Sequence, residues 1–120
     1  MTVRLYVPAT VRGLRTMVDD QRFVSEPGAE PVLAEADDEE SEYAALMTAA
    51  DLSTALAVQA DVAGLRRVVV VVESPVSALS EPVPLRDVVA VHLDTEDRAR
   101  DADPDDDLAW FAPTELAELL

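Results

Sequence analysis

The chain has 120 residues and a net charge of −16, with 25 acidic residues against nine arginines and no lysine. This length predicts one domain over residues 1–120, and the charge disfavours direct binding to nucleic acid or to an anionic membrane. Cysteine is absent, which excludes a disulfide framework, a thiolate metal site and a cysteine nucleophile.

Strands and helices are expected to alternate in the first half of the chain. In Val3–Val7 apolar residues recur at every second position, as in a strand. A helix is then expected over residues 10–20, with Thr10 as its N-cap. A loop and a weak strand at Val32–Ala34 follow. A long helix is then expected over residues 42–60, with Ser41 as its N-cap.

The second half is expected to contain three more strands and a final helix. The unbroken valines of residues 66–73 (RRVVVVVE) indicate a central strand that is buried on both faces. Residues 88–93 (VVAVHL) and 108–112 (LAWFA) are the other two strands. Pro113 at a first helical position then opens the last helix.

This order predicts an α/β fold with a mixed, mostly parallel sheet of about five strands and three helices. Alternating strands and helices favour parallel strands joined by helical crossovers. The connection over residues 74–87 has three prolines and no convincing helix, so the strand at 88–93 is expected to run antiparallel. A two-layer α+β, ferredoxin-like arrangement is the alternative. Acidic loops are expected near residues 35–41 and 94–107.

The carboxyl edge of the parallel strands is the first candidate site for a ligand or an anion. No glycine-rich phosphate loop is present, because the chain has three glycines and the first strand is followed by "PAT". A helix N-terminus still attracts anions. The candidate residues at this edge are Thr10, Arg12, Glu73 and Ser74, and an N-cap beside a solvated arginine is the competing interpretation.

His92 and Asp94 are a candidate acid–base pair. They lie two residues apart, so their side chains are able to point the same way from a strand. His92 is the only histidine, which excludes a two-histidine zinc site within one chain. A half-buried strand histidine without a catalytic role is the alternative, because no nucleophile accompanies the pair.

The acidic segments suggest metal binding or nucleic-acid mimicry, and each meets an objection. Alternate aspartates from Asp101 to Asp107 match the first half of a calcium-loop frame, but Asp106 replaces the glycine and Ala112 the closing glutamate. We therefore expect no metal and no cofactor. Mimicry needs rigidly spaced carboxylates, whereas these acids lie in loops.

The long helix carries more apolar surface than one sheet contact requires. Leu52 and Leu56 project away from the main apolar stripe, which makes them a candidate interface. The second patch meets either another part of the chain or a partner, and that partner is another protein or a second copy.

Five segments, in order, resemble an uncharacterised family of short acidic actinobacterial proteins, a domain of unknown function. The resemblance covers about half of the chain and implies an actinobacterial origin. The absence of lysine, asparagine and isoleucine, which have AT-rich codons, suggests a GC-rich genome in keeping with that origin, and a salt-adapted proteome is the alternative explanation for an acid excess without lysine. It implies no activity and no site residues. The segments are VRLYVPAT (3–10), EYAAL (42–46), RRVVVV (66–71), VPLRDVVAVHLD (83–94) and LAWFAPTELAELL (108–120).

The function that the sequence favours is a non-enzymatic protein-interaction or regulatory module. Arginines interrupt the N-terminal apolar residues, so no signal peptide is expected and the location is predicted to be cytoplasmic. The alternatives are a small ligand-binding protein or enzyme that uses the carboxyl edge of the sheet, and a nucleic-acid mimic.

Overall fold

Four antiparallel strands form the central sheet in the described part of the chain. The computed structural model describes residues 2–75, 79 and 81–119. A small second sheet pairs β2 (Arg22–Phe23) with β4 (Val83–Pro84). In the central sheet every neighbouring pair is antiparallel, and the order is β1 (Val3–Ala9), β3 (Val68–Ser74), β5 (Val88–Leu93) and β6 (Ala109–Phe111).

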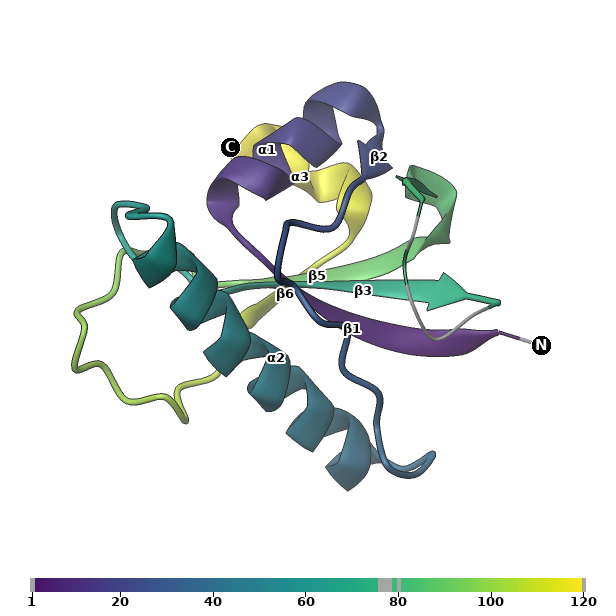
Figure 1. Cartoon of the computed structure of the whole chain (residues 1–120), viewed down its shortest axis with the longest axis horizontal. Helices are drawn as coiled ribbons and strands as arrows, with labels where there is room; N and C mark the ends of the chain where they lie inside the picture. Colours follow the sequence, from purple (N-terminus) through teal and green to yellow (C-terminus); the bar gives the residue numbers. More distant parts are fainter. Residues whose placement is uncertain (1, 76–78, 80, 120) are drawn as a thin grey trace.

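Helices cover both faces of this sheet, so the protein has three layers (Figure 1). Short α1 and α3 lie on one face, and long α2 crosses the other. None of the helices in the described part of the chain is long and apolar enough to cross a membrane. The helices are α1 (Val11–Asp20), α2 (Glu39–Gln59) and α3 (Leu116–Leu119), with 3-10 turns at η1 (Leu85–Asp87) and η2 (Pro113–Glu115).

The prediction of a mostly parallel sheet is wrong, and the path of α2 gives the reason. Glu42 near the start of α2 contacts Arg4, and Ser53 in its second half contacts Ala9, so the helix runs along β1 in the direction of that strand. A parallel crossover needs a helix that returns to the start of the strand. Here α2 ends near the last residue of β1, and β3 begins at the same end of the sheet with Val68. The two strands therefore run in opposite directions.

The two-layer alternative is also wrong, because helices cover both faces of the sheet. Three helices and the antiparallel direction of residues 88–93 are confirmed. In the described part of the connection before β5, the chain forms the short strand β4 and a 3-10 turn. An antiparallel neighbour needs no crossover helix.

The predicted burial of the valine strand is confirmed. Residues Val68–Val72 are at most 3% exposed, and alternate valines pack on opposite faces of the sheet. Each buried valine contributes about 1.5–3 kcal/mol by leaving water. An unbroken apolar run therefore indicates that both faces of the strand are covered. It does not indicate the direction of the neighbouring strands.

Alanine and serine line the face of α2 that meets the sheet. Ala49 and Ser53 are fully buried there, so the helix approaches the strands closely. The helix begins earlier than expected, because the Asp38 carboxylate, not Ser41, caps it by accepting a 2.7 Å hydrogen bond from the Ser41 amide. Acids in its first turn stabilise the positive end of the helix.

The two edges of the sheet differ in how they are covered. Along β1, the amide and carbonyl of Tyr6 exchange hydrogen bonds of 2.9 Å with those of Val32, so a single bridge stands where a strand at 32–34 was expected. Along β6, no further strand pairs within the described residues. The backbone at this second edge is therefore open.

Candidate functional site

A buried ion pair anchors the acidic loop (residues 94–107) to the sheet. Arg67, directly before β3, is 1% exposed, and Asp94, directly after β5, is 8% exposed. The Asp94 carboxylate accepts hydrogen bonds from Nε and NH2 of Arg67 at 2.8 and 2.9 Å and from its backbone amide at 2.8 Å. The guanidinium also donates to the Pro104 carbonyl at 3.2 Å, which ties the far side of the loop.

The buried pair of Arg67 and Asp94 fixes the position of the acidic loop. A guanidinium removed from water is costly unless its donors find partners, and here they find Asp94 and the Pro104 carbonyl. The hydrogen bonds that Arg67 donates to the Asp94 carboxylate raise the pKa of Arg67 above its ordinary value, so the arginine stays charged. The loop is therefore held at both ends against the end of the sheet.

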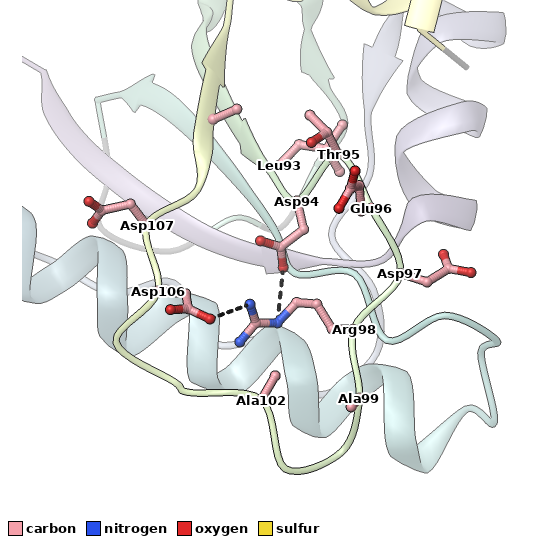
Figure 2. A pocket seen from close by; sticks show the side chains of 11 residues that line it. Leu93, Asp94, Thr95, Glu96, Asp97, Arg98, Ala99, Ala102, Asp106 and Asp107 are labelled. Carbon is pink, nitrogen blue, oxygen red and sulfur yellow. Dashed lines mark hydrogen bonds and ion pairs between the residues drawn. The ribbon is translucent and has the colours of Figure 1, made fainter.

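Arg98 holds the interior of the acidic loop. Its guanidinium lies 3.5 Å from Asp94 and 3.3 Å from Asp106, and it donates to the Asp103 carbonyl at 2.8 Å. Its backbone amide donates to the Gly64 carbonyl at 2.7 Å. Figure 2 shows the Arg98 side chain reaching across the loop between Asp94 and Asp106.

A hollow of about 470 Å³ opens inside this loop and extends to Ala109, the first residue of β6. We call it the acidic hollow. Of the carboxylates that line the hollow, Glu96 and Asp107 have no arginine partner within the described residues. In Figure 2 the carboxylate of Asp107 points away from Arg98. Five carboxylates and one guanidinium line the hollow: Asp94, Glu96, Asp97, Asp106, Asp107 and Arg98.

The carboxylates of the loop are separated by their own partners rather than gathered around one point. Asp107 accepts a 2.9 Å hydrogen bond from the Tyr43 hydroxyl, and Asp103 accepts one from the Asp105 amide. In the described ranges, no group of three or more His, Cys, Asp or Glu side chains is arranged to hold a metal ion. The carboxylates of the loop therefore produce a diffuse negative electrostatic field.

The most exposed large apolar side chain of the described residues comes directly after Ala109, which lines this hollow. Trp110 of β6 is 58% exposed and pairs in register with His92 of β5, which in turn pairs with Val69. Paired residues share a face, and Val69 packs toward α2. Trp110 therefore lies on the α2 face of the sheet at its open edge.

His92 and Asp94 are not joined by a hydrogen bond in the described part of the chain. The Asp94 carboxylate is bonded to Arg67 instead. Burial lowers the pKa of His92, and no charged neighbour contributes to this shift. An acid–base role for His92 and Asp94 stays a prediction, and it requires a rearrangement of the ion pair.

The predicted anion position at Thr10 is filled by a side chain of the protein. Thr10 caps α1 as expected, with its hydroxyl oxygen accepting from the Gly13 amide at 3.2 Å. The hydroxyl donates to Oε1 of Glu26 at 2.6 Å, so this carboxylate lies at the positive end of α1. Arg12 is exposed beside it.

The structure does not bring the four candidate residues of the carboxyl edge together. Because β3 is antiparallel to β1, Glu73 and Ser74 lie opposite Arg4 and Val3, at the end of the sheet away from Thr10. Glu73 accepts from Arg4 at 3.3 Å on the surface. Binding by Thr10 and Arg12 remains a prediction, and Glu73 and Ser74 would belong to a different site.

The two candidate interface leucines have different surroundings. Leu52 is 38% exposed on α2. Leu56 is partly buried and lines a hollow of about 300 Å³ together with Thr10 and Glu26. The structure therefore places one candidate interface residue beside a candidate ligand residue, at the junction of α2 and the start of α1.

Sequence reasoning did not single out three residues of this region: Ser53, Arg67 and Trp110. The Ser53 hydroxyl donates to the Ala9 carbonyl at 2.7 Å and accepts from the Val68 amide at 2.8 Å, which joins β1 to β3. Two signals were available in the sequence. Arg67 abuts a buried strand, and Trp110 is the sole tryptophan of the chain.

Fold and site together define a three-layer protein with an antiparallel sheet, an open edge strand and an acidic loop at one end. The chain belongs to a family of unknown function (DUF6912), whose model matches residues 3–120. The resemblance to a domain of unknown function is thus confirmed. No curated protein and no solved structure matches the chain.

Proposed function

We propose that this protein is a non-enzymatic protein-interaction module whose contact surface is the open edge of the sheet at β6. One observation carries the proposal. Trp110, 58% exposed, projects from an edge strand that has no further backbone partner within the described residues. Tryptophan is among the residues that dominate binding energy at protein interfaces, and an unpaired edge is a template for strand addition.

The surroundings of the candidate ligand-binding and acid–base residues support this choice over an enzyme. The carboxylate of Asp94 is bonded to Arg67, and the positive end of α1 holds Glu26. Thr10 and Glu73 lie at opposite ends of the sheet. An acyl-transfer or hydrolytic site needs these kinds of group to converge within hydrogen-bond reach of one reacting atom.

Partner capture with matched variants tests the proposal. Trp110→Ala removes the side chain on the open edge, and Val24→Ala removes one that is 51% exposed beyond β2. Affinity purification from the native cell after cross-linking is expected to recover the same partner with the wild type and with Val24→Ala, and to lose it with Trp110→Ala. Recovery of that partner with Trp110→Ala would reject the proposed surface. Leu52→Ala in the same series tests the candidate interface on α2.

A small-ligand function is the second candidate. Glu26 lines the hollow beside Leu56, and its Oε2 atom is buried and has no hydrogen-bond partner within the described residues. An amine or another hydrogen-bond donor would satisfy this atom. Screening small amines by thermal shift, with Glu26→Gln as the control, tests this candidate. A wild-type shift that Glu26→Gln also shows would reject it.

The proposal includes a cytoplasmic location in an actinobacterium. It is supported by the family resemblance, by the absence of cysteine and by a composition without lysine, asparagine or isoleucine. Cell fractionation followed by detection of the protein tests the location. Recovery with the culture medium would contradict it.

A further inference from the structure

We propose that β6 accepts an extended, basic segment of another protein as an added strand, and that an arginine or lysine of this segment enters the acidic hollow. The inference rests on the proposed interaction function and names the chemical class of the partner. Three features at this edge of the sheet support it: an open strand, an exposed indole ring and a negative field.

The strand is the first feature. On its inner side β6 pairs with β5 from Ala109 to Phe111, and within the described residues its outer side has no backbone partner. Ala109 and Trp110 are exposed, so an approaching chain meets no covering segment at these two positions. An added strand would satisfy the free amides and carbonyls, while its alternate side chains supply the specificity.

The indole ring is the second feature. Side chains of the added strand that point toward the α2 side lie next to Trp110, because neighbours across a strand pair share a face. The face of an indole ring attracts guanidinium and ammonium groups. Trp110 is therefore suited to contact a basic side chain, or the aliphatic stem of one, at the open edge.

Charge is the third feature. The acidic loop has eight acidic residues and two arginines, and it leads directly into β6. Its hollow ends at Ala109, so a segment that pairs with β6 passes the hollow as it leaves the strand. Glu96 and Asp107 lack an arginine partner in the described part of the chain, and Asp107 also accepts a hydrogen bond from the Tyr43 hydroxyl. Their charges are the ones that a partner's cation would offset.

A second copy of this chain fits the surface less well. Parallel pairing of two β6 strands would bring the two acidic loops together. Antiparallel pairing would bring each loop beside Glu115 and Glu118, which follow β6 in the partner copy. Like charges oppose both arrangements, and each copy carries a net charge of −16. A basic partner reverses the sign of these interactions.

Selection from a random-peptide display library on the whole protein tests the inference. We expect enrichment of peptides with at least one arginine or lysine next to β-branched residues and without proline. Enrichment of acidic, neutral or proline-rich peptides would overturn the inference, and so would a library that yields no binder.

Affinities of an enriched peptide, labelled for fluorescence anisotropy, then locate the site. Trp110→Ala is expected to weaken binding about 30-fold, the range of an interface hot spot. The double variant Glu96→Gln/Asp107→Asn is expected to weaken it about fivefold and to flatten its salt dependence. Asp19→Asn/Asp20→Asn makes the same charge change on α1, across the sheet, and is expected to leave binding unchanged. Equal losses in both double variants would show only a non-specific effect of charge and overturn the assignment.

Strand addition has its own readout. Two versions of the peptide are made, one N-methylated at odd-numbered amides and the other at even-numbered amides. Each version loses the hydrogen bonds that one edge of the added strand donates and keeps the charge of the peptide. The version methylated on the edge that faces β6 is expected not to bind. Full binding by both would reject strand addition. If the cellular partner depends on Trp110 while the selected peptides are not basic, the interaction function stands and this inference fails. If no cellular partner depends on Trp110, the interaction function itself fails.

Discussion

Replacing Asp94 with asparagine removes one charge of the buried ion pair while keeping the shape of the side chain. Arg67 is 1% exposed and directs its backbone amide, Nε and NH2 to the Asp94 carboxylate at 2.8–2.9 Å. An asparagine turns an amide group toward at least one of these donors. The guanidinium then stays buried without a counter-ion.

The expected loss is about 3–5 kcal/mol in the free energy of unfolding, the range for breaking a buried pair from one side. Domains of this size are stable by about 5–15 kcal/mol, so Asp94→Asn is expected to remove a large part of the total. The surface pair of Arg4 and Glu73 provides the contrast. Its side chains are 46% and 42% exposed, and Glu73→Gln is expected to cost at most about 1 kcal/mol.

Urea unfolding followed by far-UV circular dichroism measures both variants, and equal slopes against urea concentration show that the same surface unfolds. The double variant Arg67→Met/Asp94→Leu, which removes both charges, is expected to recover most of the lost stability. A loss below about 1 kcal/mol for Asp94→Asn, no larger than that of Glu73→Gln, would refute the reasoning.

Three further outcomes are expected. Ser53→Ala removes the hydroxyl that bridges Ala9 and Val68, and urea unfolding should show a loss of about 1–3 kcal/mol, whereas an unchanged midpoint would contradict the bridge. Burial lowers the pKa of His92 in the folded state, so its contribution to stability is fully present above the ordinary value of 6.5 and is lost as pH falls through the window below it. NMR titration should give a pKa below 6.5, and His92→Gln should flatten the dependence of stability on pH in that window; a pKa above 6.5 would contradict the burial. Gly64 has a φ of 87°, so Gly64→Ala should cost about 1 kcal/mol or more, and a more stable variant would contradict the strain.

Local pattern was sufficient to predict the buried central strand and the start of the first helix, but not the short strands β2 and β4. The valine run predicted a strand buried on both faces, because burial of every side chain requires two covered faces. Thr10 predicted the start of α1, because a hydroxyl there satisfies a free amide of the first turn. These predictions held because each depends on residues within one or two turns of one another.

The candidate site was less predictable, since its residues meet only through the fold. Arg67 and Asp94 are separated by the whole of β3 and β5, and their pairing depends on the antiparallel register of those strands. Glu26 reaches the start of α1 from a loop beyond the helix. No spacing in the sequence indicates either contact, because both join segments that approach one another only in space.

By itself, the sequence determined the charge of the chain, the approximate positions of the helices and the buried centre of the sheet. Charge, cap residues and apolar periodicity are properties of neighbouring residues, and they act before any long-range contact forms. Only the tertiary structure decided strand direction and the open edge at β6. The course of α2 along β1 sets the end of the sheet at which β3 begins. A strand becomes an edge when no other segment of the chain reaches it, and only the complete path of the chain determines that.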